Sequence, residues 1–240
     1  AEALNIKGDI IKADDSKESL EILRHSCAHM MAQAIKELYP EAKFFVGPVV
    51  KEGFYYDFKV ESKISDEDLP AIEKKMKEIA DRKLPITRHE TTKEEFYEKF
   101  KNDELKQAVL KNIKDDTLTI YKQGDFEDLC RGPHLPNTRM IRSFKLTRVA
   151  GAYLGGDEKN EMITRIYGIA FFDKQALFDY TKMIEEAKKR DHRKLGTELE
   201  LFTFNDDVGA GLPMWLPNGA RLRSKLEHLL YKAHRIRGYE

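Results

Sequence analysis

The 240-residue sequence has only two cysteines, no net charge and no long apolar segment. Two cysteines argue against a disulfide scaffold, so Cys27 and Cys130 are expected to be free in a reducing compartment. No apolar run approaches the roughly 20 residues of a membrane-spanning helix, and no segment resembles a signal peptide. These absences predict a soluble, cytoplasmic protein without a membrane partner.

Charged residues are abundant but balanced, with 42 lysines and arginines against 42 aspartates and glutamates. A nucleic-acid partner would therefore have to contact a local basic patch, because the chain as a whole is not basic. Hydrophobic residues make up 41% of the chain, which is enough to build a core.

A pair of histidines marks the first informative motif, in which His25 and His29 bracket the sequence His-Ser-Cys-Ala-His. A helical spacing of four residues places both imidazoles on one face, as two metal ligands or as a pair of proton-handling groups. The histidines lie away from the apolar stripe of the same helix, so they face solvent or line a cleft covered by another element. That stripe consists of Leu20, Leu23, Cys27, Met30, Met31, Ala34 and Leu38.

The second motif is Asp-Leu-Cys-Arg-Gly-Pro-His at residues 128–134. It supplies a thiol, Cys130, and a third imidazole, His134, again four residues apart. Gly132 and Pro133 between them indicate a rigid turn. The two motifs together predict one shared polar site, and three histidines with one cysteine could complete a tetrahedral zinc centre.

Periodicity and turn residues predict a chain of alternating helices and strands. We expect a hairpin over residues 43–60 and a long helix from Lys174 to about Leu195. The remaining predicted helices are the histidine helix, which stops before Pro40, and 65–82, 92–100, 103–113 and 221–237. The remaining predicted strands are 85–90, 117–122, 144–149, 162–172 and 199–204.

Six motifs occur in the order seen in bacterial threonyl-tRNA synthetases, and the resemblance covers nearly the whole chain. They are His-Ser-Cys-Ala-His at 25–29, Val-Gly-Pro at 46–48 with Gly-Phe-Tyr-Tyr-Asp at 53–57, the second motif at 128–134, Ala-Gly-Ala-Tyr at 150–153, Arg-Ile-Tyr-Gly at 165–168, and Lys-Arg-Asp-His-Arg-Lys-Leu-Gly at 189–196.

The resemblance implies an α+β fold, in which an editing domain has a mainly antiparallel sheet and flanking helices. It further implies a long linker helix and a partial class II core segment. The implied boundaries are 1–14 for the tail of a preceding small domain or a linker, 15–176 for the editing domain, 177–194 for the linker helix and 195–240 for the truncated start of the aminoacylation domain. The resemblance implies that this chain lacks the synthetic active site, whereas the full-length enzyme uses ATP, magnesium and zinc and is a homodimer.

The activity that the resemblance implies is hydrolysis of serine wrongly esterified to threonine tRNA, with the 3′ end of that tRNA as partner. Serine and threonine differ by one methyl group, which is worth only about 1–3 kcal/mol in a binding pocket, so a second, hydrolytic site improves accuracy. Ester hydrolysis needs a positioned water, a proton acceptor, oxyanion stabilisation and protonation of the departing ribose oxygen.

Residue roles also follow from the resemblance. His25 would orient or activate water, and Lys106 would be the assisting lysine, with Lys111 or Lys114 as alternatives. The implied catalytic set is His25, His29, Lys106, Asp128, Cys130 and His134, and the implied substrate-binding residues are Tyr56 and Arg131.

The metal content of the site separates two hypotheses. The resemblance favours editing without a cofactor, with water in place of a metal, whereas spacing alone favours zinc held by His25, His29, Cys130 and His134. A zinc-dependent editing hydrolase of the alanyl type and a non-catalytic tRNA-binding module are the alternative functions.

Overall fold

The computed structural model describes residues 2–4, 10–12, 14, 16–111, 113, 117–209 and 211–239. The chain divides into two compact units, Ala1–Phe178 and Asp179–Glu240, each of which is considered by itself. Among the helices of the described ranges, none is long and apolar enough to cross a membrane.

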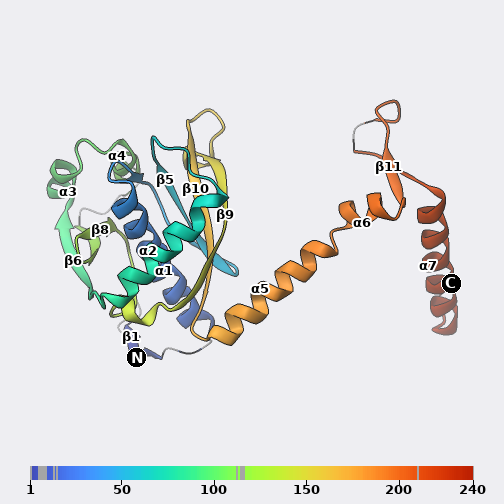
Figure 1. Ribbon diagram of the computed structural model, residues 1–240, viewed down its shortest axis with the longest axis horizontal. Helices are drawn as coiled ribbons and strands as arrows, with labels where there is room; N and C mark the ends of the chain where they lie inside the picture. The colour runs from blue at the N-terminus through green and yellow to red at the C-terminus, as the bar shows by residue number, and fades with distance from the viewer. Residues whose placement is uncertain are drawn as a thin grey trace. The chain divides into compact units, whose positions relative to one another are not determined.

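The first unit is built on a five-stranded antiparallel sheet (Figure 1). Its strands are β3 (Lys43–Phe44), β4 (Val49–Val50), β5 (Gly53–Lys59), β9 (Ser143–Tyr153) and β10 (Met162–Phe171). The order is β3-β5-β10-β9, with β4 paired to β5. Side chains alternate along a strand, so Phe54, Tyr56 and Phe58 of β5 all point into the core.

Two long helices pack with this sheet: α1 (Lys17–Leu38) contacts β5 and β10, and α2 (Leu69–Asp81) contacts α1 and β9. α1 begins where the Ser16 side chain accepts a hydrogen bond from the Ser19 backbone N–H. Between Ser19 and Ile35 it is buried on nearly every side, because the sheet, α2 and a second small sheet surround it. The helix thus carries its histidines through the interior of the unit.

The second, small sheet has the antiparallel order β6-β7-β8. Its strands are β6 (Ile86–Thr92), β7 (Thr117–Gln123) and β8 (Phe126–Leu129), accompanied by α3 (Lys93–Lys99) and α4 (Glu104–Lys111). β8 contacts α1 and leads directly into the loop that bears Cys130 and His134. The small sheet therefore delivers the second motif to the histidine helix.

Shorter elements complete the chain. They are β1 (Glu2–Leu4) paired with β2 (Ile10–Lys12), the 3₁₀ turns η1 (Asp66–Asp68), η2 (Thr138–Met140) and η3 (Leu154–Gly156), and then α5 (Lys174–Lys189), α6 (His192–Glu198), β11 (Phe202–Phe204) paired with β12 (Pro213–Trp215), and α7 (Pro217–Ile236).

The expected α+β class with antiparallel sheets is confirmed, and one expected element is corrected. The single helix predicted from Lys174 to Leu195 is two helices, because Asp191 accepts a hydrogen bond from the Arg193 backbone N–H and caps a new helix. An aspartate at this position accepts a hydrogen bond from a backbone N–H group at the start of a helix. It therefore favours the start of a new helix at residue 192 over continuation of α5.

Candidate functional site

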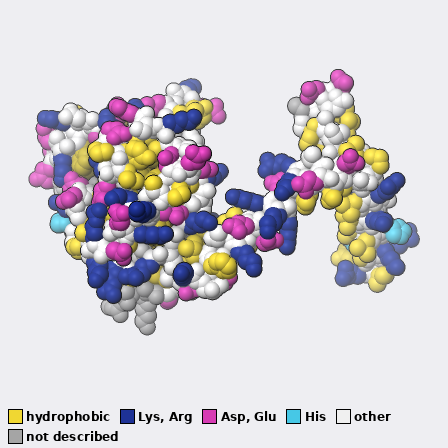
Figure 2. Space-filling view, in the orientation of Figure 1, with side chains coloured by type: hydrophobic (Ala, Val, Ile, Leu, Met, Phe, Trp, Pro, Cys, Tyr) yellow, Lys and Arg dark blue, Asp and Glu magenta, His cyan; other side chains and the backbone are white. Residues whose placement is uncertain are grey.

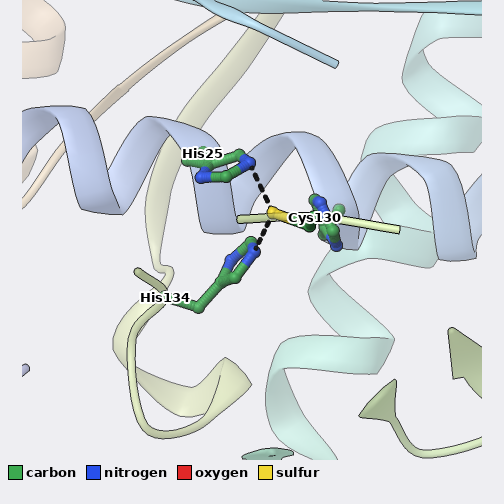
Figure 3. Close-up of side chains that lie close together, drawn as sticks. His25, Cys130 and His134 are labelled. Carbon is green, nitrogen blue, oxygen red and sulfur yellow. Dashed lines mark hydrogen bonds between the residues drawn. The ribbon is translucent and has the colours of Figure 1, made fainter. Parts of the chain in front are cut away.

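The two motifs meet, as the sequence predicted. The ligand atoms of His25, His29, Cys130 and His134 all lie within 4.8 Å of one another. The Cys130 Sγ atom lies 3.1 Å from His25 Nε2 and 3.2 Å from His134 Nε2, between the two rings (Figure 3). We call these four residues the His/Cys cluster.

The His/Cys cluster lies in the interior and not on the surface. His29, His134 and Cys130 are 4%, 7% and 9% exposed, and His25 is partly exposed. The sequence left open whether the histidines face solvent or line a cleft covered by another element. In the structure they are covered, because the loop after β8 lies over α1.

Backbone groups hold the loop in place. The Gly132 N–H donates to Cys130 Sγ at 3.1 Å, and the Leu135 N–H donates to Ser26 Oγ at 2.9 Å. Gly132 has a φ of +67°, and a Cβ there would come within 2.1 Å of the Tyr121 hydroxyl oxygen. Glycine is needed at this position because other residues are strained at this φ and would collide with the tyrosine.

Burial keeps the cluster uncharged. It lowers the pKa of His25 to about 4, although the carbonyl of Pro133 accepts a hydrogen bond from this ring and opposes the shift. It also holds the pKa values of His29 and His134 well below their usual range, and it raises the pKa of the Cys130 thiol to about 12. At neutral pH the site therefore contains three neutral imidazoles and a protonated thiol.

A second buried polar group lies beside the His/Cys cluster. The Asp128 carboxylate accepts hydrogen bonds from the Lys106 ammonium, from the Tyr56 hydroxyl and, at 2.8 Å, from the Leu129 N–H. Lys106 and Asp128 are 4% and 3% exposed, and Tyr56 is 1% exposed. Burial raises the pKa of Asp128 and lowers that of Lys106 to about 8.

The other predicted residues occupy different places. Lys111 is exposed at the end of α4, and Lys114 lies outside the described residues. Tyr56 belongs to the core and reaches the site through its hydroxyl, whereas Arg131 is exposed. Sequence reasoning missed Ser26, whose Oγ lies 3.1 Å from His134 Nδ1, because no local spacing links residues 108 positions apart.

Two cavities flank the site. A cavity of about 460 Å³ reaches Lys106 and Asp128, and its wall includes the rings of Phe44, Phe100 and Phe126. A smaller one of about 210 Å³ lies on the side of Cys130 and Arg131. The larger cavity gives a small polar group access to the Lys106–Asp128 pair.

The His/Cys cluster fits a zinc ion by its chemistry. Zinc bonds of about 2.0–2.3 Å place tetrahedral donor atoms about 3.3–3.8 Å apart, and the four donors here all lie within 4.8 Å. Small side-chain rotations would therefore close a tetrahedron. A bound zinc would act as a Lewis acid toward a carbonyl oxygen or a water.

The neutral imidazoles predict a stability that depends on pH. The folded chain resists protonation of His25 down to about pH 4, whereas an unfolded histidine takes up a proton near 6.5. The unfolded state thus binds more protons in this window, and stability falls as pH is lowered through it. For His25 alone we expect a loss of about 2–3 kcal/mol.

Urea unfolding of the native chain and of His25→Gln at several pH values between 7 and 4 measures this loss. The carboxylates titrate equally in both proteins, so the variant should lose less of its unfolding free energy than the native chain. Parallel curves for the two would contradict the prediction.

Comparison with known proteins first identifies the class of domain that carries the second motif. Residues 118–167 match the family described as the second additional domain of threonyl and alanyl tRNA synthetases. This segment includes β8, the loop with Cys130 and His134, and β9. The part of the site that the second motif contributes thus lies in a segment that resembles a domain of threonyl and alanyl tRNA synthetases.

Individual relatives are threonine–tRNA ligases. The chain is 73% identical over 227 residues to that of Campylobacter lari, a match covering 95% of this chain and 38% of the relative. It is 67% identical over 230 residues to that of Sulfurovum sp. strain NBC37-1, covering 96% and 38%. The resemblance to threonyl-tRNA synthetases is confirmed, and the chain spans 38% of the length of these relatives.

Proposed function

We propose that this chain hydrolyses the ester between serine and threonine tRNA, as the editing site of a threonyl-tRNA synthetase. The observation that carries the proposal is the convergence of the His/Cys cluster and the Lys106–Asp128 pair within one buried site. Half of that site comes from the segment that matches the second additional domain. The threonine–tRNA ligase relatives supply the threonine tRNA as the expected carrier.

Neutral imidazoles suit the proton transfers of this reaction. In the proposed step a water molecule takes the place of the Cys130 thiol at His25 Nε2, its oxygen attacks the ester carbonyl carbon, and this nitrogen of the neutral ring accepts the proton that the water gives up. The bond from that carbon to the ribose oxygen then breaks, and the oxygen leaves with the proton that His25 had accepted, which returns the ring to its neutral form. His25 is partly exposed, so water can reach its ring.

The Lys106 ammonium suits the developing negative charge on the carbonyl oxygen. Its pKa of about 8 leaves it mostly protonated at neutral pH, and the Asp128 carboxylate orients it. The Tyr56 hydroxyl in turn holds Asp128. His29, Cys130 and His134 lie around His25, and we assign the exposed Arg131 to the nucleotide end of the substrate.

Contact with the tRNA must depend on local cations, because the chain has no net charge. Figure 2 shows lysine and arginine side chains intermingled with aspartate and glutamate over the visible face of the first unit. We propose that recognition centres on the 3′ end of the tRNA. The domain boundaries at residues 15–176, the cytoplasmic location, and the ATP-dependent ligation and dimerisation of a longer enzyme are parts of the same proposal.

The test is deacylation of threonine tRNA charged with serine or with threonine by the 240-residue chain. The seryl ester should be hydrolysed and the threonyl ester largely spared, because a site shaped around serine excludes the extra methyl group. Equal rates with both esters would contradict the exclusion of the threonine methyl group by size. No hydrolysis of either ester would contradict the proposed function.

The donor set itself favours zinc-dependent hydrolysis as a second candidate, since the four donors lie within 4.8 Å. The two candidates predict opposite responses to metal removal. For the preferred metal-free mechanism we expect seryl-tRNA hydrolysis to survive extensive chelation and the zinc content to be well below one per chain. Elemental analysis measures the zinc content, and the rates of seryl-tRNA hydrolysis are compared before and after chelation. Recovery of one zinc per chain, with activity restored only by zinc, would favour the second candidate.

A further inference from the structure

Ser26 carries a buried hydroxyl that contacts the His/Cys cluster. It lies between His25 and Cys27 on α1 and is 0% exposed. Its Oγ lies 2.9 Å from the backbone nitrogen of Leu135 and 3.1 Å from Nδ1 of His134. Both partners belong to the loop after β8.

The direction of these two hydrogen bonds follows from counting donors. The Leu135 N–H can only donate, so Oγ accepts from it. The Ser26 hydroxyl hydrogen then needs an acceptor, and within the described part of the chain its one hydrogen-bond acceptor is His134 Nδ1. A buried donor without an acceptor costs about 1–3 kcal/mol, so the hydroxyl donates to Nδ1.

The rest of the His/Cys cluster agrees with this direction. If Nδ1 of His134 accepts, its proton is on Nε2, which lies 3.2 Å from Cys130 Sγ. The His25 ring donates to the Pro133 carbonyl, and its Nε2 lies 3.1 Å from the same sulfur. The sulfur can thus accept from His134 and donate its own hydrogen to His25. Every polar hydrogen in this chain of contacts then has an acceptor.

We infer that Ser26 is a positioning residue, which holds His134 in the tautomer protonated at Nε2 and thereby directs the Cys130 thiol toward His25. The catalytic value of this arrangement rests on the proposed function, whereas the tautomer does not. A metal ion would need the lone pair of His134 Nε2 and would force the proton onto Nδ1. The Ser26 hydroxyl would then lose its acceptor, so Ser26 also opposes zinc binding.

Long-range proton–nitrogen NMR correlation of the ¹⁵N-labelled chain reads the tautomer directly, with His134→Asn used to assign the signal. We expect the Nε2-protonated form in the native chain. Ser26→Ala should shift His134 toward the other tautomer, and Ser26→Thr, which keeps the hydroxyl, should preserve the native pattern. Ser143→Ala, which removes a buried hydroxyl from β9, is the matched control.

Zinc titration of the same proteins gives an independent readout. Removing the hydroxyl removes the penalty for switching the tautomer, so Ser26→Ala should bind zinc about tenfold more tightly than the native chain. A native His134 protonated at Nδ1, or equal zinc affinity with an unchanged tautomer in a folded Ser26→Ala protein, would overturn the inference. Native chain that fails to hydrolyse seryl-tRNA yet gives the expected tautomer would overturn only the proposed function.

Discussion

Replacing Lys106 by alanine is expected to lower the free energy of unfolding by about 3–5 kcal/mol, because it leaves a buried carboxylate without its cation. Lys106 and Asp128 are both almost fully buried, and the ammonium is a direct partner of the Asp128 carboxylate. Lys111→Ala on the same helix is the control, since Lys111 is exposed. Urea unfolding at neutral pH measures the difference.

A second variant separates loss of the charge pair from loss of packing. Lys106→Met combined with Asp128→Asn removes both charges while keeping most of the volume, so it should recover a large part of the stability. Equal destabilisation by Lys106→Ala and Lys111→Ala would mean that the buried pair contributes nothing. The same proteins also report whether Lys106 or Lys111 assists hydrolysis, since only loss of the former should slow it.

His25→Ala is expected to slow single-turnover hydrolysis of seryl-tRNA by roughly a hundredfold or more while the fold persists. His25 is partly exposed, and its pKa of about 4 keeps the ring neutral at physiological pH. His89→Ala removes an exposed imidazole from β6 and should leave the rate unchanged. Circular dichroism and unfolding curves confirm that each variant is folded.

The pH dependence of the same reaction gives a further check on His25. With a pKa of about 4, the rate should stay nearly flat from pH 8 to pH 6 as far as His25 is concerned. An unchanged single-turnover rate for His25→Ala would remove His25 from the proposed proton transfer and leave its contact with Cys130 as a structural one.

Local features of the chain were predictable from the sequence because their causes are local. Four-residue spacing places His25 near His29, whatever the rest of the chain does. The aromatic residues of β5 and the capping residues before α2 indicated a strand and a helix close to those observed. The free state of the two cysteines agrees with their scarcity.

Two helices show what local patterns leave open. The apolar stripe of α1 left open whether its histidines face solvent or a covering element, and in the structure residues on nearly all sides of this helix are buried. The break between α5 and α6 depends on a side-chain cap at Asp191 that competes with helix continuation. Neighbouring groups decide how much of α1 is buried and where α5 ends. Hydrophobic periodicity carries no information about those groups.

The sequence by itself determined which groups are available to the site: three imidazoles, a thiol, a carboxylate and several candidate lysines. Only the tertiary structure decided that Lys106 is the lysine against Asp128 and that Ser26 contacts His134. It also decided their charges, because burial keeps the His/Cys cluster neutral and draws the carboxylate and the ammonium toward their neutral forms. Desolvation and ion pairing depend on groups that are far apart in the chain, so they cannot be inferred from spacing along the sequence.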